Sequence, residues 1–338
     1  LGADTNSVML ANGTSLETTT DVSAQQALHI TGNVAVDTAG NNSSFVGVIS
    51  GSAKLVKEGA GSLTLSGVNT YAGSTDINAG TLVISQDGNL GKAGTGVAIN
   101  NATLSLNGSV AVDRTIALAG TTATVNTTTG SSSLVKEVSG SAALVKTGAG
   151  TLTLNSANSY TGGTSVAAGK VALDANTALG LGAATFAKDT ELSLGISKGV
   201  SVANAIKTDG VITQSNNFDS SLTGVISGTG SLVKEGTGLL SLTGANSYSG
   251  GTQVAAGKVA LDANTALGLG AATFAKDTEL SLGISKGVSV ANAIKTDGVI
   301  TQSNNFDSSL TGVISGTGSL VKEGTGLLSL TGANSYSG

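Results

Sequence analysis

Apolar and polar residues alternate in short runs along most of the chain. Leu63 and Leu65 flank a threonine, and the same spacing returns at Leu82 and Ile84, Leu104 and Leu106, and Ile116 and Leu118. A period of two is typical of strands that have one buried and one exposed face. Gly, Ser, Thr and Asn, which favour turns, separate the runs, and no stretch has the period of a long amphipathic helix. The pattern therefore predicts an all-β protein made of short strands.

The strand pattern recurs with a long period. Residues 166–250 are identical to residues 254–338, a period of 88, and residues 59–65 return in related form as 148–154, after 89. The predicted units are about 1–79 (partial and diverged), 80–168 (diverged), 169–256 and 257–338, of which the last two are nearly identical. Strands of about five residues with short turns make sides of roughly seven or eight. Three such sides would make a coil of about 22 residues, and four coils would fill one unit.

These features favour a parallel β-solenoid (β-helix) with roughly three strands per coil and about 15 coils. A sandwich or barrel closes after a fixed number of strands, so an exact duplication would need a second closed domain and a linker. Propeller blades usually carry aromatic signatures, whereas only 3% of these residues are aromatic. We therefore expect residues 1–338 to form one continuous solenoid segment. Because the chain starts and stops inside a unit, we expect it to belong to a longer protein.

Charge and composition narrow the possible functions. The net charge is -5, and the 16 basic residues are scattered along the chain and include a single arginine, Arg114, which disfavours a nucleic-acid partner. The absence of cysteine excludes disulfides, thiolate zinc sites and thiol nucleophiles. No run approaches the roughly 18 apolar residues of a membrane-spanning helix. We expect no nucleic acid, no cofactor and no membrane insertion for this segment.

Candidate catalytic residues are few. His29 is the only histidine, which removes most catalytic triads and metal sites. Asp189 and Glu191, repeated as Asp277 and Glu279, would point to one side of a strand and could suit acid and base chemistry on a glycosidic bond. A solvated strand end explains them more simply. We therefore predict no catalytic, cofactor-binding or metal-binding residue and no enzyme activity.

Two alternative functions stay open at this point. A parallel β-helix enzyme acting on polysaccharides would need one acidic cleft that does not repeat. A solenoid that binds ice or minerals would need a regular threonine array, of which Thr122 and Thr124 form only an isolated pair.

A lysine–glutamate pair and one tyrosine recur at matching places in the units. We interpret them as candidate repeated surface contacts, spaced about 19 Å apart if four coils of about 4.8 Å separate the copies. A solvated turn for the charge pair and a packed corner for the tyrosine are the simpler interpretations of the same spacing. The candidates are Lys57, Glu58, Tyr71, Tyr160, Lys234, Glu235, Tyr248, Lys322, Glu323 and Tyr336, and in the second unit the charge pair is assigned to Lys136 and Glu137.

One motif of fixed spacing covers about a third of each unit. In the first unit it comprises Leu55, Lys57, Gly59, Gly61, Leu63, Leu65, Gly67, Asn69, Tyr71, Gly73, Thr75, Ile77, Gly80 and Leu82. It returns unchanged in spacing from Leu232 to Val259, and the second unit departs from it at Ser156. The motif resembles the autotransporter-associated β-strand repeat, found in passenger regions of type V secreted proteins of Gram-negative bacteria.

The resemblance implies a right-handed parallel β-helix on the bacterial cell surface. Export and anchoring would use an outer-membrane barrel outside this sequence. The implied role is that of an adhesin-like shaft in adhesion, cell–cell aggregation, biofilm or filament formation. Its partner would be the surface of a host or neighbouring cell, or further copies of the same protein.

Overall fold

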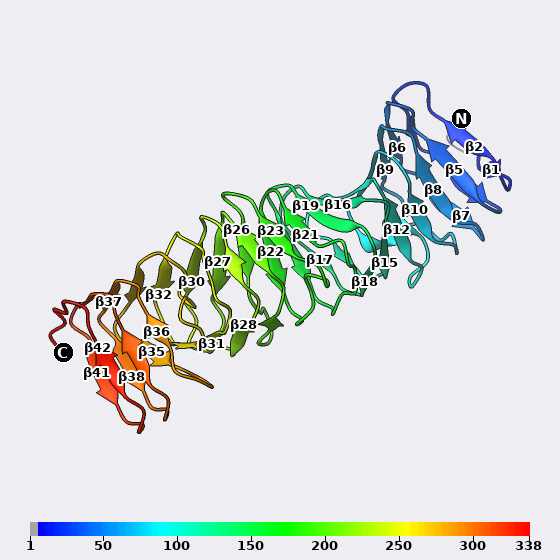
Figure 1. Cartoon of the computed structure of the whole chain (residues 1–338). Helices are drawn as coiled ribbons and strands as arrows, with labels where there is room; N and C mark the ends of the chain where they lie inside the picture. The colour runs from blue at the N-terminus through cyan, green and yellow to red at the C-terminus, as the bar shows by residue number, and fades with distance from the viewer. Residues whose placement is uncertain (1–5) are drawn as a thin grey trace. The chain divides into compact units, whose positions relative to one another are not determined.

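The computed structural model describes residues 6–338, and these residues form short strands and one 3-10 segment, η1 (Asp87–Leu90) (Figure 1). The chain divides into two compact units. Unit 1 comprises residues 1–169 and 178–182, and unit 2 comprises residues 170–177 and 183–338.

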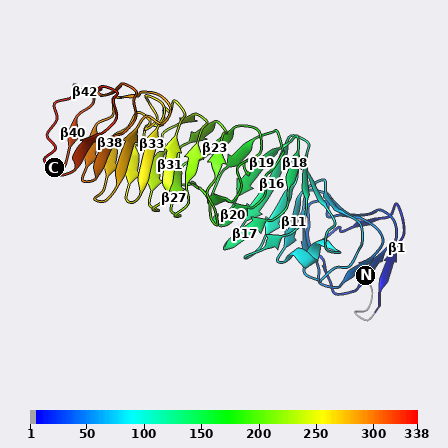
Figure 2. The same cartoon turned by 90° about the horizontal axis from the view of Figure 1, so that it is seen from below.

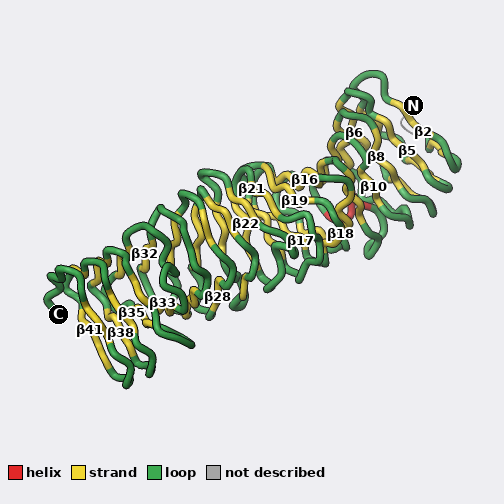
Figure 3. The backbone as a smooth tube through the Cα atoms, in the orientation of Figure 1, coloured by secondary structure: helices red, strands yellow, loops and turns green. Residues whose placement is uncertain are grey.

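In unit 1 the strands form parallel ladders between successive turns of the chain (Figure 3). One ladder contains β1 (Val8–Leu10), β4 (Leu28–Ile30) and β7 (Ile49–Gly51). The next contains β2 (Ser15–Glu17), β5 (Val34–Asp37), β8 (Leu55–Glu58), β10 (Thr75–Ile77), β12 (Val97–Asn100), β15 (Ile116–Ala119) and β18 (Val138–Gly140). The third contains β3 (Ser23–Ala24), β6 (Asn42–Phe45), β9 (Ser62–Leu65), β11 (Thr81–Ile84), β13 (Thr103–Leu106), β16 (Thr122–Thr127), β19 (Ala143–Thr147) and β21 (Thr164–Val166), and a further ladder contains β14 (Ala111–Val112), β17 (Ser131–Leu134) and β20 (Thr151–Leu154).

Unit 2 repeats this arrangement, and Figure 2 shows its strands from below. The longest ladder contains β22 (Lys170–Leu173), β24 (Glu191–Ser193), β27 (Val211–Gln214), β30 (Ser231–Lys234), β32 (Thr252–Val254), β34 (Ala272–Phe274), β37 (Ile294–Thr296) and β40 (Ile314–Ser315). A second contains β25 (Ser201–Val202), β28 (Ser220–Leu222), β31 (Leu239–Leu242), β33 (Lys258–Leu261), β35 (Glu279–Leu282), β38 (Val299–Gln302) and β41 (Ser319–Lys322). Two shorter ladders contain β23 (Ala184–Phe186), β26 (Ile206–Thr208) and β29 (Ile226–Ser227), and β36 (Ser289–Val290), β39 (Ser308–Leu310) and β42 (Leu328–Leu330).

The strands pair in parallel, and each pairing joins one turn of the chain to the next. Three sides per turn and an all-β solenoid are therefore confirmed. Residues paired on strands of adjoining turns lie 20 positions apart for Leu55 and Thr75 and 22 positions apart for Thr81 and Thr103. The expected coil of about 22 residues is thus the upper of these two values.

The core consists of inward side chains that stack from turn to turn. Leu63, Leu82 and Leu104 follow one another in register, and none is exposed to solvent. Parallel strands lie about 4.8 Å apart, so identical side chains in successive rungs touch along their full length. The alternating sequence thereby places one residue of each pair in the core and leaves the other outside.

Glycine is required where the strands approach each other at a corner. Gly51 has φ +115, and a Cβ there would lie 2.0 Å from the carbonyl oxygen of Ile30 in the preceding turn. Gly140 repeats this geometry at φ +116 against Leu118. No other residue fits such a position without moving the backbone.

The sequence repeat does not contain a whole number of turns, which corrects the expected four coils per unit. In unit 1 four successive pairings lead from β8 to β10, β12, β15 and β18. The strand that matches β8 in sequence is the next one, β19, which pairs with β16 in a different sheet. Unit 2 shows the same shift, because four pairings lead from β30 to β40 whereas its sequence counterpart is β41. Each repeat thus takes four turns and one additional side.

Candidate interaction surface

The recurring lysines point into the solenoid instead of toward a partner. Lys57 is fully buried, and its ammonium donates hydrogen bonds to the carbonyl oxygens of Glu58 (2.6 Å), Gly59 (2.7 Å) and Ala79 (3.2 Å). Ala79 lies one turn later, so the lysine joins two turns at a corner. Lys146 repeats the arrangement with Thr147 (2.9 Å), Gly148 (2.8 Å) and Ala168 (3.0 Å), and Lys234 does so with Gly236 and Ala256.

The recurring tyrosines are core residues as well. The Tyr71 hydroxyl lies 2.6 Å from Thr75 Oγ1, which donates to the carbonyl oxygen of Leu90. A Cβ at Gly91 would come within 2.6 Å of the Tyr71 ring, so the glycine lets the next turn lie over it. Burial raises the pKa of Tyr71 to about 12. Tyr160 with Thr164 and Tyr248 with Thr252 have the same geometry.

Asn69 completes this motif inside the corner. Its Oδ1 accepts a hydrogen bond from the Ile49 amide, one turn earlier, and its Nδ2 donates to the Asn89 carbonyl oxygen, one turn later. Asn158 and Asn246 make the equivalent pair of bonds. The polar residues of the motif therefore satisfy buried backbone groups across three turns.

The predicted surface contacts are accordingly wrong for Lys57, Tyr71, Tyr160, Lys234 and Tyr248, all of which are buried. Buried carbonyl groups at each corner need donors, which are the lysine and the threonine that is hydrogen-bonded to the tyrosine.

Among the remaining candidates, Glu58 is partly exposed and accepts a hydrogen bond from Asn78 Nδ2 at 2.8 Å. Glu235, Lys322 and Glu323 are exposed, and Tyr336 is partly exposed. Lys322 and Tyr336 lie in the last described turn, where no following turn covers them.

The second unit's charge pair was assigned to the wrong residues. The buried counterpart of Lys57 is Lys146, whereas Lys136 is exposed and forms an ion pair with Asp113 at 3.3 Å. Sequence spacing contained the signal, because Lys146, and not Lys136, lies one repeat period after Lys57.

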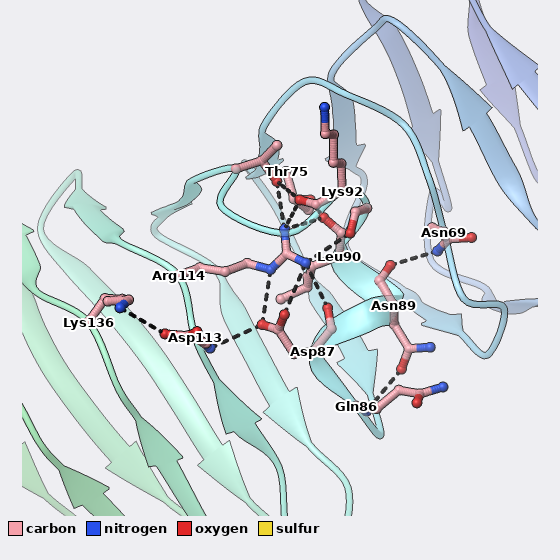
Figure 4. A network of polar contacts seen from close by, with 12 residues as sticks. Asn69, Thr75, Gln86, Asp87, Asn89, Leu90, Lys92, Asp113, Arg114 and Lys136 are labelled. Carbon is pink, nitrogen blue, oxygen red and sulfur yellow. Dashed lines mark hydrogen bonds and ion pairs between the residues drawn. The ribbon is translucent and has the colours of Figure 1, made fainter.

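A buried arginine that sequence reasoning did not select organises one loop of unit 1 (Figure 4). Arg114 is 1% exposed, and its guanidinium binds both carboxylate oxygens of Asp87. It also donates to the carbonyl oxygens of Asp87, Leu90, Gly91 and Lys92 and to Thr95 Oγ1. The five donors of a guanidinium suit such a cluster of acceptors.

The outer faces carry shallow grooves floored by columns of hydroxyl groups. In unit 2 two copies of one groove are present, and in each the Oγ atoms of two paired serines lie 2.7 Å apart. The columns are Ser201, Ser221 and Ser241 in one copy and Ser289, Ser309 and Ser329 in the other, and unit 1 has a related column of Ser23, Ser44 and Thr64. Phe218 and Phe306, each 44% exposed, adjoin the two unit 2 grooves in sequence. These outward residues form part of the exposed surface.

Comparisons with known proteins identify the motif. A family model described as Passenger-associated-transport-repeat matches residues 55–84, 144–173, 232–261 and 320–338. These stretches contain the corner lysines and all three buried tyrosines described above. The chain is also similar over its whole length to the Adhesin BmaC autotransporter of Brucella suis biovar 1 (strain 1330), with 32% identity over 379 aligned positions.

The chain is an autotransporter passenger segment with passenger-associated-transport repeats. It spans 11% of the length of the Brucella relative. No solved structure matches it.

The passenger segment pairs or covers most of the residues first considered for catalysis. His29 Nδ1 lies 3.1 Å from Ser50 Oγ on the neighbouring strand. Glu191 forms an ion pair with Lys170 at 2.8 Å, and Glu279 does so with Lys258 at 2.8 Å. Asp189 is exposed in a corner turn with φ 63.

Two further features of residues 6–338 bear on function. No helix in this range has the length and apolar character needed to cross a membrane. Within the same range no three His, Asp or Glu side chains gather closely enough to hold a metal ion.

The corner lysines give the passenger segment a specific pH dependence. Burial lowers the pKa of Lys146 from 10.5 to about 8, so between these values the unfolded chain binds the proton that the folded chain has released. Folding is then favoured as pH rises, and the penalty of the buried charge applies in full below pH 8. We expect the stability of the unmodified chain relative to Lys146→Met to increase from pH 8 to 10.5, measured by urea unfolding at each pH.

The matched control for this experiment is Lys136→Met, which removes an exposed lysine. Its stability difference from the unmodified chain should stay nearly constant over the same range. A Lys146→Met difference that does not change with pH would contradict the assigned effect of burial.

Proposed function

We propose that this passenger segment is an adhesive shaft on the bacterial cell surface that contacts host or neighbouring cells. The observation that carries the proposal is that the repeat uses different residues for the core and for the outer surface. Its lysine, tyrosine and asparagine side chains are used inside the corners, which builds a long stack of turns. The outward positions are then free to vary and to make contacts. The similarity to an autotransporter adhesin supports this role.

The surface chemistry favours many weak, repeated contacts and not a single deep binding site. The grooves are shallow and lined by serine hydroxyls, with one exposed phenylalanine beside each unit 2 copy. Individually weak contacts gain strength when several are engaged together. A shaft that repeats its surface suits adhesion for this reason.

We also propose that the segment is not an enzyme. A glycosidic mechanism needs two carboxyl groups placed on either side of the substrate bond. Glu191 is already paired with Lys170 at 2.8 Å, and the pair recurs as Glu279 with Lys258. In both copies a lysine therefore already neutralises the glutamate, which is not available as one of two free carboxyl groups.

Binding to ice or minerals is disfavoured by the register of the strands. Thr124 is paired with Thr103 on one side but with Val145 on the other. Thr122 pairs with Ala143. The threonines therefore form no extended regular array.

The proposal is tested by shortening the shaft within the full-length protein. Removing residues 166–253 joins residue 165 to Val254, which restores the original junction sequence because residue 166 is also valine. The variant should reach the cell surface in equal amount but support about half the adhesion to host cells or less, since one of two identical copies is lost.

The control is a variant that keeps the length and replaces one exposed residue outside the linings of the serine grooves, Lys207→Ser. It should adhere like the unmodified protein. Unchanged adhesion after removal of residues 166–253, with equal surface amounts, would overturn the proposal for host cells. Loss of cell clumping alone, with light scattering showing fewer associated molecules, would identify a second copy of the protein as the partner.

A further inference from the structure

We infer that each repeat presents its outward surface on a different side of the solenoid from the repeat before it. Consecutive copies of the surface then engage separate partner molecules. This inference rests on the proposed adhesive function. Its geometric part can be tested without any adhesion measurement.

The two copies of the serine groove lie on different sheets of unit 2. The groove with Ser221 lies on β25, β28 and β31, and its copy with Ser309 lies on β36, β39 and β42. These two sets of strands belong to different sheets of unit 2. Two grooves of identical sequence therefore open on different faces.

The exposed lysines of unit 2 show the same rotation. Lys207 lies on β26, which pairs with β23 and β29. Its counterpart Lys295, one repeat later, lies on β37, which pairs with β34 and β40 in another sheet. Both side chains are exposed. The rotation thus applies to charged surface positions as well as to the grooves.

The cause is the mismatch between the repeat and the turn. Backbone amides donate to the corner asparagines of the adjoining turn at a sequence separation of 20, so one repeat advances the chain by four turns and one of three sides. The inward pattern tolerates this advance because all three sides have the same alternation of inward and outward residues. Strands β30 and β41 have the same sequence and can therefore occupy equivalent places on two different sheets.

This geometry determines which partner the surface fits. In a continuous run of such repeats the same surface returns to one face only at every third copy, about 62 Å along the axis at roughly 4.8 Å per turn. Neighbouring copies cannot both touch one flat surface. They fit separate partner molecules, each engaging one face. The single patch repeated at intervals of about 19 Å, which was first expected, is not formed.

The inference is tested by distances between spin labels in the purified protein, which contains no cysteine of its own. The test pair is Lys207→Cys with Lys295→Cys. The reference pair is Val233→Cys with Ser315→Cys, which occupy one outward column four rungs apart through Gln253, Thr273 and Lys295. The reference distance between backbones should be about 19 Å, and the test pair should be roughly 10 Å longer, because it spans two faces.

Binding of streptavidin to biotin attached at the same cysteines measures the functional consequence. The test pair should accept two streptavidin molecules per chain, whereas one should occupy or block both sites of the reference pair. Equal label distances in the two pairs, or one streptavidin on both, would overturn the inference. Failure of the adhesion experiment would leave these measurements unaffected, so the two proposals are distinguishable.

Discussion

Replacing Arg114 by methionine should destabilise unit 1 more than any exposed substitution. The variant removes seven hydrogen bonds from a guanidinium that is 1% exposed. The carbonyl oxygen of Gly91 would lose its donor, those of Leu90 and Lys92 would each lose one of their donors, and Asp87 would lose its counter-ion. Loss of one partner from a buried charged network costs about 3–5 kcal/mol. We expect a loss of that size in urea unfolding.

The loss of stability in Arg114→Met should appear first in the loop whose backbone is hydrogen-bonded to Arg114. Hydrogen exchange should speed up first in residues 85–96, which include η1, because their backbone groups contact Arg114 directly. The stability of Arg114→Lys should lie between those of the unmodified chain and Arg114→Met, since lysine keeps the charge but has fewer donors.

The matched control for this substitution is Lys136→Met. It breaks the Lys136–Asp113 pair, whose side chains are 55% and 58% exposed, and exposed pairs contribute less than about 1 kcal/mol. Equal losses for Arg114→Met and Lys136→Met would show that the buried network adds nothing to stability.

Replacing Leu240 by aspartate should disrupt the core of unit 2. Leu240 is fully buried on β31 and stacks between Ser220 and Val259 of the adjoining turns. Removing a leucine from a core costs about 2–5 kcal/mol, and an unpaired carboxylate adds a desolvation penalty. We expect a loss of at least about 4 kcal/mol in thermal or urea unfolding, with faster hydrogen exchange in β28 and β33.

The control for Leu240→Asp is the next residue along the strand. Ser241 is partly exposed and points to the outer face, so Ser241→Asp should change stability by no more than about 0.5 kcal/mol. The contrast between neighbouring residues tests the inward and outward assignment of β31. Comparable effects of the two substitutions would refute it.

The candidate site was the part of the molecule that sequence reasoning predicted least well. Lys57 and Tyr71 looked like surface residues because charged and hydroxyl-bearing side chains usually lie outside. Lys57 donates to Ala79 in the next turn, and Tyr71 reaches the Leu90 carbonyl oxygen, also about one turn later, through Thr75. Sequence spacing alone does not show that a corner has carbonyl groups in need of donors. The alternative of a packed corner tyrosine was the correct one.

Arg114 shows the same limitation in another form. It occurs once in the chain, so the repeat provided no reason to select it. Its acceptors lie between residues 87 and 95, about one turn earlier. Only the stacking of turns brings this loop around the guanidinium.

The sequence by itself determined the class of architecture. Alternation with a period of two specifies strands, and near-identical units without linkers specify stacking, because each turn contacts only its neighbours. The spacing of the motif from Leu55 to Leu82 was sufficient to place the chain among autotransporter passengers. These features are local or periodic, so they can be read along the chain.

The tertiary structure alone decided which side of the solenoid each residue occupies. Turns differ in length, because Leu55 pairs with Thr75, 20 residues later, whereas Thr81 pairs with Thr103, 22 residues later. The number of turns in a repeat follows only from the pairing register of the strands. The additional side per repeat could therefore not be predicted from the sequence. The same register decides whether a lysine such as Lys146 reaches carbonyl groups of the next turn or solvent. Both outcomes depend on contacts between residues about one turn apart, which follow from how the turns stack.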